Sequence, residues 1–371
     1  MKMKELNIAN KLMKKRKEKG VTQDQLAAYI GVSKASVSKW ETGQSYPDIT
    51  FLPQLAAYFN ISVDELIGYE PQMTKEDIRR LYHRLAGEFS KRPAEDVFQE
   101  CEEIVKKYYS CFPLLLQMVV LYFNHYVLFK DPKQQETVLL KAAELCRRVK
   151  KESGDVSASS QANTMEASIE LMSGRPEKVL ELLDEEIRPD LYNATILVEA
   201  YRLLGNKEKA TETVQISLYQ YLMGIMAFTI QALTLYEQDE EKFEMIIERS
   251  LRLTEAFEVE SLHGNAMAQF YFAAAMGYLK QEKEDRALNM LERYENVCVN
   301  SMLPFTLHGD EFFDLIDPWL HDFDLGVKAP REDKLMRESM VSALEIPPMA
   351  SLKNNPRYEE IVKRMKRRTE I

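Results

Sequence analysis

The sequence is poor in the residues and motifs that carry chemistry. Its 371 residues include four cysteines, five histidines and two tryptophans. It contains no Walker-type phosphate loop, no GxGxxG pattern and no GxSxG nucleophile turn. These absences argue against nucleotide-dependent and hydrolytic enzymes. We therefore expect no enzymatic activity and no cofactor.

The potential metal ligands and thiols are scattered. The four cysteines show neither close pairing nor ligand spacing, which is typical of reduced, buried thiols in a cytoplasmic protein. Histidines and aspartates gather loosely near residues 308–322, but no HExxH or other fixed spacing is present. We expect no metal site there and interpret the segment as a capping element. The residues concerned are Cys101, Cys111, Cys146, Cys298, His308, Asp310, His321 and Asp322.

Long apolar runs are also missing. The N-terminus lacks the apolar run of a signal peptide. The most apolar stretch, Phe112–Phe129, contains Gln117, Asn124 and His125 and lies among amphipathic segments, so we interpret it as a buried helix and not as a membrane span. The sequence therefore predicts a cytoplasmic protein with no membrane partner.

What the chain does contain is concentrated near its start, in the run TQDQLAAYIGVSKASVSKWETG over residues 22–43. This run predicts two short helices joined by a tight turn at Gly31, with Thr22 capping the first helix and Ser33 the second. Ala27 is small where the two helices must cross. The apolar positions expected to pack inward are Leu26, Ile30, Val37 and Trp40.

The outer face of the predicted second helix is short, polar and cationic, as entry into a DNA major groove requires. Residues 1–43 hold ten Lys and Arg against four Asp and Glu, a net charge of +6, whereas the whole chain carries −10. A basic end on an acidic protein places the attraction for phosphate at the motif. The outer-face residues are Lys34, Ala35, Ser36, Ser38 and Lys39.

Residues 6–68 resemble the DNA-binding domain of the Cro/phage-repressor (XRE-type) regulators. The tail LPQLAAYFNISVDELIG is as typical of that family as the central motif. The resemblance implies a five-helix, lambda-repressor-like domain. Its helices are expected at Ile8–Lys19, Gln23–Ile30, Ser33–Thr42, Thr50–Phe59 and Val63–Ile67.

The same resemblance implies roles for single residues. Thr22 and Gln23 are expected to touch the DNA backbone or a base edge, and Arg16 is expected to pair with Glu41 inside the domain. The face carries Ala35 and two serines where better-known members carry longer amides, so the operator sequence cannot be inferred. An alternative is that the domain serves only for dimerisation or as an adaptor. The full expected DNA-binding set is Thr22, Gln23, Ser33, Lys34, Ala35, Ser36, Ser38 and Lys39.

About 300 residues remain beyond this domain. We expect the DNA-binding domain over 1–69, a linker over 70–74 and a helix beginning at Lys75. From there the chain shows almost no strand signal, and apolar residues recur at helical spacing. Polar turns separate the amphipathic segments at positions spaced 31, 33 and 43 residues apart. These turns are marked by Gly174, Gly205, Gln238 and Gln281.

The first two spacings lie near the roughly 34 residues of a tetratricopeptide (TPR) repeat. The sequence therefore predicts an all-α chain, in which the DNA-binding domain precedes an α-solenoid of TPR-like helical hairpins over 75–303. A helical capping region is expected over 304–371. The alternative is an irregular helical bundle.

In such a solenoid the first helix of each hairpin lines a concave groove that fits extended peptides or partner helices. Asn163, Asn193 and Asn265 each fall in a predicted first helix, and an Asn amide can clamp a peptide backbone because it both donates and accepts. Ordinary exposed or capping asparagines are the alternative. Further candidates are Tyr192, Tyr201, Gln231, Gln269 and Tyr271.

A DNA-binding head joined to helical repeats is similar to Gram-positive quorum-sensing regulators, which bind short signalling peptides. The resemblance implies a sequence-specific transcriptional regulator that binds a double-stranded DNA operator as a homodimer. Its repeat domain would dimerise and sense a short peptide. The alternative is a DNA-tethered adaptor whose repeats bind a partner protein.

Overall fold

The computed structural model describes residues 8–68, 72–184, 186–187 and 192–369. The chain divides into two units, Met1–Thr74 with Tyr108–Cys111, and Lys75–Lys107 with Phe112–Ile371. Within the described residues every regular element is a helix, beside one isolated β-bridge between Thr306 and Lys328. The predicted all-α fold class is confirmed.

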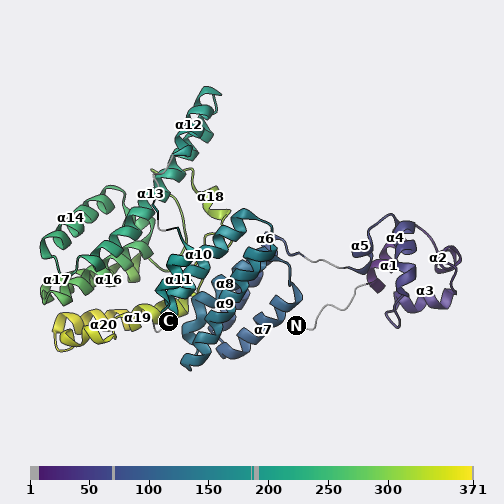
Figure 1. The fold of residues 1–371 in the computed structure, drawn as a ribbon, viewed down its shortest axis with the longest axis horizontal. Coiled ribbons are helices and arrows are strands. Elements are labelled where there is room, and N and C mark those ends of the chain that lie inside the picture. Colours follow the sequence, from purple (N-terminus) through teal and green to yellow (C-terminus); the bar gives the residue numbers. More distant parts are fainter. Residues whose placement is uncertain (1–7, 69–71, 185, 188–191, 370–371) are drawn as a thin grey trace. The chain divides into compact units, whose positions relative to one another are not determined.

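The first unit contains the five predicted helices within its described residues (Figure 1), and each observed end lies close to the expected one. Thr50, the expected start of the fourth helix, falls in a short 3-10 turn that leads into α4. The elements are α1 (Ile8–Glu18), α2 (Gln23–Ile30), α3 (Lys34–Glu41), η1 (Ile49–Phe51), α4 (Leu52–Phe59) and α5 (Val63–Ile67).

Local signals set the geometry of α2 and α3. The Thr22 hydroxyl accepts a hydrogen bond from the Gln25 backbone N–H at 3.2 Å, and Ser33 accepts one from Ser36 N–H at 3.1 Å. Gly31 between the helices has φ +81°, which glycine adopts without a steric penalty. The predicted inward positions are all buried, and Ala27 lies with them in one core.

The second unit begins with pairs of packed helices. Consecutive helices contact one another from α8 through α11, and α12 packs on α13 (Figure 1). The elements are α6 (Lys75–Phe89), α7 (Ala94–Lys107), α8 (Phe112–His125), η2 (Tyr126–Leu128), α9 (Pro132–Glu152), α10 (Val156–Met172), α11 (Pro176–Leu182) and α12 (Asn193–Leu203).

The unit continues through α17 and ends in the C-terminal region, where α20 packs on α17 and α19. The elements are α13 (Lys207–Leu235), α14 (Glu240–Ala256), α15 (Val259–Leu262), α16 (Gly264–Lys280), α17 (Glu284–Asn300), α18 (Asp317–His321), α19 (Asp333–Ala343), η3 (Pro347–Leu352) and α20 (Pro356–Thr369).

All the predicted turns lie between helices, but the segments between them differ from the expected pairs. Between Gly205 and Gln238 the chain forms one helix, α13, of 29 residues. No proline interrupts this stretch, and Gly224 alone does not break it. The longer interval from Gln238 to Gln281 contains an extra short helix, α15, between α14 and α16.

By length and composition alone, α13 could also cross a membrane. Core helices of soluble proteins pass the same test. Tyr219, Leu222 and Met226 of α13 lie buried in the main core of the second unit, and Gln215 donates to Asp314 at 2.7 Å. One side of α13 therefore belongs to the protein interior.

Candidate functional site

The outer face of α3 presents the expected reading residues to solvent. Ala35 and Lys39 are exposed, and Ser38 is half-buried. Lys34 forms an ion pair with Asp24 of α2 at 2.7 Å, and both side chains are about 60% exposed. Exposed ion pairs contribute little free energy, so Lys34 can exchange this partner for a phosphate or a base.

Other members of the expected DNA-binding set already have partners inside the unit. The Ser36 hydroxyl lies 2.8 Å from Ser33 Oγ at the start of α3. The half-buried Gln23 donates from Nε2 to Glu41 Oε2 at 2.9 Å. Gln23 therefore has a structural bond, and the exposed part of the expected DNA-binding set centres on Lys34, Ala35 and Lys39.

The predicted pair of Arg16 and Glu41 joins α1 to the end of α3. The two side chains meet through a fork, with Nε 2.5 Å from Oε1 and Nη2 2.9 Å from Oε2. Glu41 is only 4% exposed. Burial acts to raise the pKa of this carboxyl, but hydrogen bonds from Arg16 and Gln23 outweigh it, and the pKa of Glu41 is lowered.

The asparagines expected to share a groove are not at matching positions. Asn163 lies mid-way along α10, Asn193 is the first residue of α12, and Asn265 is the second residue of α16. Their positions counted from the start of each helix differ, because the helices begin at different distances from the turns. Tyr201 lies on α12 and Gln231 on α13, away from the cavity described below.

Asn163 has a structural explanation. Its Oδ1 accepts from Lys150 Nζ at 2.9 Å, and its Nδ2 donates to the Leu182 carbonyl at 2.6 Å. Both ends of the amide thus hold α10 to α9 and to the end of α11. The Asn163 side chain therefore connects neighbouring helices. A peptide could bind this amide only by displacing these two hydrogen bonds.

Asn265 and Gln269 do lie together. They line a cavity of about 340 Å³ between α16, α17 and α19. A volume of this size admits one or two large side chains, at the small end of the range for ligand pockets. Most of its wall is apolar, from residues that include Phe272, Tyr294, Met302, Phe305, Met336 and Met340.

Arg331 is the one arginine or lysine in the lining of this cavity. Its Nη1 donates to Ser339 Oγ at 3.1 Å, whereas its buried Nε has no hydrogen-bond partner among the described residues. Burial lowers the pKa of Arg331 from its ordinary value. An apolar chamber with two amides and one incompletely paired guanidinium can hold an apolar side chain beside a polar or anionic group.

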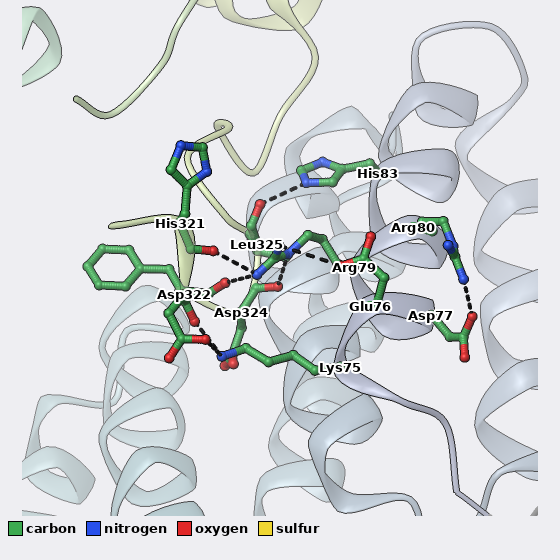
Figure 2. A network of polar contacts seen from close by, with 11 residues as sticks. Lys75, Glu76, Asp77, Arg79, Arg80, His83, His321, Asp322, Asp324 and Leu325 are labelled. Atoms are coloured by element: carbon green, nitrogen blue, oxygen red, sulfur yellow. Dashed lines mark hydrogen bonds and ion pairs between the residues drawn. The ribbon is translucent and has the colours of Figure 1, made fainter. Parts of the chain in front are cut away.

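Residues 321–332, which we call the strap, line this cavity at Ala329, Pro330 and Arg331. The first residues of the strap contact α6 (Figure 2). Arg79 donates to three strap carbonyls, those of His321 at 3.0 Å, Phe323 at 2.5 Å and Asp324 at 3.1 Å. Lys75 pairs with Asp322 at 2.8 Å.

Further along α6, His83 Nε2 lies 2.9 Å from the Leu325 carbonyl, and the buried Tyr82 donates to the Pro330 carbonyl at 2.9 Å. Pro330 also lines the cavity, beside Ala329 and Arg331. One short stretch of backbone therefore forms a wall of the cavity and a contact with α6.

Neither Arg331 nor the strap was predicted from the sequence, although the preceding segment is visibly rich in aromatic and acidic residues. Instead of binding a metal, the polar groups around 308–322 bind the chain itself. Asp310 accepts from the N–H groups of Phe312 and Phe313. Among the described residues no group of three or more potential ligands could hold a metal ion.

The first unit has a clear relationship to known domains. A helix-turn-helix family model matches residues 12–66. The first unit is an XRE-type helix-turn-helix domain. The family match covers the α2–α3 pair and the core around it, so the resemblance inferred from the central motif is confirmed.

Two curated relatives each match part of the chain. The transcriptional activator BcrR of Enterococcus faecalis is 32% identical over 88 residues, which is 22% of this chain and 43% of that protein. The cryptic phage CTXphi transcriptional repressor RstR of Vibrio cholerae is 40% identical over 63 residues, 17% of this chain and 56% of that protein. This chain thus spans about half the length of the relatives. One is named as an activator and the other as a repressor.

Among solved structures, Bacillus thuringiensis PlcR in complex with the peptide PapR7 and DNA is similar over 79% of this chain and 94% of that chain. The identity is 14% and the TM-score 0.23. At this score the likeness carries no inference about this chain.

We expect the buried pair of Arg16 and Glu41 to stabilise the helix-turn-helix domain. Glu41→Ala should destabilise it by about 3–5 kcal/mol, because it leaves the Arg16 guanidinium without its buried partner. Trp40 fluorescence during urea unfolding, with Trp319 replaced by Phe, isolates this unit. Since the pKa of Glu41 is lowered in the folded state, its contribution is present above the unfolded carboxyl pKa of about 4.3 and lost as the pH falls through the folded value.

Glu41→Ala should therefore also remove that part of the acid-induced loss of stability. Glu18→Ala is the matched control, since Glu18 is half-exposed and pairs only with lysines on its own helix. Equal unfolding midpoints for Glu41→Ala and Glu18→Ala would show that the fork does not stabilise the domain.

Because the strap is bound by Arg79 and not by Arg80, we expect the two arginines to contribute differently to stability. Arg79→Ala should destabilise the second unit by roughly 2–4 kcal/mol, because three carbonyls lose a charged donor. Arg80→Ala should leave the free energy of unfolding unchanged, since Arg80 is exposed and its ion pair is with Asp77 on its own helix (Figure 2). Trp319 fluorescence in a Trp40→Phe background reports on this unit. Equal behaviour of the two variants would contradict a structural role for the strap.

Proposed function

We propose that the chain is a cytoplasmic transcriptional regulator that binds DNA through its helix-turn-helix domain and senses a short peptide through its second unit. The observation that carries the proposal is a pairing of features on one chain. The first unit has a recognition face with exposed Lys34 and Lys39. The second unit has an apolar cavity that contains Asn265, Gln269 and Arg331.

The charge distribution supports the DNA-binding half of the proposal. The first 43 residues are basic and the rest of the chain is acidic, so nucleic acid is attracted to one end of the chain. A single domain of this size makes few base contacts. Two copies on half-sites about 34 Å apart would supply the remaining affinity. We therefore also propose that the regulator acts as a homodimer on a two-fold operator.

The cavity supports a peptide as the ligand. Its volume fits one or two large apolar side chains, and the flanking amides of Asn265 and Gln269 can bond the donors and acceptors of an extended backbone. Arg331 can pair with a carboxylate, such as the end of a peptide chain. A folded partner protein or a helix does not fit inside a chamber of about 340 Å³.

The strap offers a route from this cavity toward the helix-turn-helix domain. It forms part of the cavity wall and also holds α6, and α6 follows in the sequence directly after the expected linker at 70–74. The strap would need two conformations, and a peptide that binds one of them more tightly would raise the population of that conformation. The contacts between the strap and α6 would change with it. Such a ligand could then change how the two DNA-binding domains of a dimer engage their half-sites.

The second candidate function is the DNA-tethered adaptor. An exposed apolar surface on α12 and α13 favours it, because such surfaces mark protein partners. The two functions differ in where their ligands bind. A peptide sensor uses the cavity, whereas an adaptor would use the outer surface.

The proposal predicts that Lys34→Ala with Lys39→Ala reduces specific DNA binding on the order of a hundredfold, since each base or phosphate contact contributes about 1–3 kcal/mol. The fold should be unchanged, because both side chains are exposed. The probe is a duplex selected from a random library by the wild-type protein, titrated at constant salt. Lys130→Ala in the second unit is the control. Wild-type affinity in the double variant would show that α3 is not the reading helix.

The proposal also predicts the location of the peptide site. A heptapeptide selected from a random synthetic library by the full-length protein should bind roughly tenfold to a hundredfold more weakly to Asn265→Ala with Gln269→Ala, since each lost amide costs about 0.5–1.5 kcal/mol. Calorimetry measures the peptide affinity. DNA binding without peptide should not change.

Asn193→Ala with Gln231→Ala is the matched control, because it removes one amide from each of two helices outside the cavity. If this pair loses the peptide while the cavity pair retains it, the site lies along α12 and α13 instead. If the library yields no binding peptide at all, the sensor function fails and the adaptor remains.

A further inference from the structure

The long helix α13 carries two apolar stripes, one buried and one that is largely exposed beyond Ile225. The covered stripe includes Tyr219, Leu222, Met226 and Leu233, all buried. In the second stripe Leu218, Tyr221 and Ile225 each precede a covered residue by one position, and its members recur at intervals of four and three residues. Its members are Val214, Leu218, Tyr221, Ile225, Phe228 and Leu235, which are 39%, 41%, 45%, 48%, 78% and 79% exposed.

The spacing of this second stripe identifies the kind of partner it fits. Apolar side chains that recur at alternating intervals of four and three residues form the seam along which one helix packs on another. Ala232, half-buried, occupies the position between Phe228 and Leu235 in the same pattern. The stripe therefore runs over three heptads, and the surface that complements it is another long apolar helix.

The neighbouring helix α12 faces only the beginning of the stripe, where Ala194, Thr195 and Val198 line a cavity of about 180 Å³ together with Val214, Leu218 and Tyr221. The short helix α12 packs on α13, yet none of its own described residues is buried. Near the start of the stripe, Tyr192 and Tyr221 touch with ring centroids 6.1 Å apart. Beyond Ile225 the exposure rises to nearly four-fifths, and α12 adds exposed apolar residues of its own, namely Ile196, Leu197, Leu203 and Leu204.

The area of this surface matches an interface between proteins. With side-chain areas on the order of 200 Å², the exposed fractions amount to roughly 600 Å² on the α13 stripe and roughly 500 Å² on α12. The largest apolar patch on a typical monomer is about 300–600 Å². A stable interface covers about 800 Å² on each partner. The surface is therefore large enough for a specific dimer.

We infer that a second copy of this chain covers the stripe, with α13 of one protomer packed on α13 of its partner about a two-fold axis. A two-fold axis brings identical surfaces together, so the stripe would complement itself. The inference rests on the homodimer of the proposed function and names its surface. It does not depend on the peptide.

Charge supports pairing between identical helices. From Val214 to Leu235 the sequence contains no charged residue, so two copies can meet without repulsion between like charges. Gly224 flanks the stripe, and a Cβ placed there would meet nothing within 4 Å. The backbone is thus open to close approach of a partner at that point.

The test measures the mass of the full-length protein in solution by sedimentation equilibrium. The wild type is expected to be a dimer at micromolar concentration. Gly224→Glu and Phe228→Glu should each weaken the dimer on the order of a hundredfold or more, because each would bury an unpaired charge in the interface. Among the described residues nothing lies within 4 Å of a Cβ at Gly224, and Phe228 is 78% exposed, so we expect the fold to be kept. Circular dichroism checks this. Val156→Glu, at an apolar residue that is 86% exposed on α10, is the control and should leave the dimer intact.

Each result separates the inference from the proposed function. A dimer that survives both glutamate variants would place the interface elsewhere, while the homodimeric regulator would stand. A wild-type monomer would overturn both the stripe pairing and the homodimer, whereas DNA titration and peptide calorimetry would still test the rest of the function. A wild-type monomer that floats with phosphatidylglycerol vesicles, and that Phe228→Glu releases, would overturn the inference in favour of a membrane surface. Monomeric variants that keep half-site binding would support the inference.

Discussion

The contact between the strap and α6 is the constraint on which the second unit depends. Hairpins in a stacked helical array are held only by their neighbours, so the two ends of an array are its weakest parts. Here the first helix of the unit is bound by a segment more than 240 residues later in the chain. Arg79 supplies a charged donor to three backbone carbonyls, and Tyr82 and His83 extend the contact along the helix. The array is therefore tied from its last part to its first.

The contact between the strap and α6 connects the cavity to the first helix of the second unit. A pocket between α16, α17 and α19 would affect only the end of an open array. Because Pro330 both lines the pocket and accepts a bond from Tyr82, any change in the pocket wall reaches the helix at the opposite end of the unit. The residues expected to line one groove do not lie together in the fold. The amides that share a site, Asn265 and Gln269, are one turn apart on a single helix, whereas Asn163 is used to hold two neighbouring helices.

The helix-turn-helix domain follows from short-range signals, and most of it could be predicted. Thr22 and Ser33 cap their helices through bonds to residues three positions later, and Gly31 supplies the left-handed turn between them. The Arg16–Glu41 fork spans only 25 positions. The structure added that Gln23 bonds to Glu41, and that the Ser36 hydroxyl lies beside Ser33. The free reading face is thus narrower than the motif alone indicates.

The sequence by itself determined where helices begin and end over much of the chain, because caps, glycines and polar turns act within a few residues. It also determined which side chains of α3 point outward, since the spacing along one short helix decides this. Only the tertiary structure decided which apolar stripe of α13 is covered, that Arg331 joins Asn265 in one cavity, and that the strap lies on α6. Helical periodicity shows that a face is apolar or charged, but the element that covers it lies up to some 250 residues away. That choice is made by the packing of the whole unit.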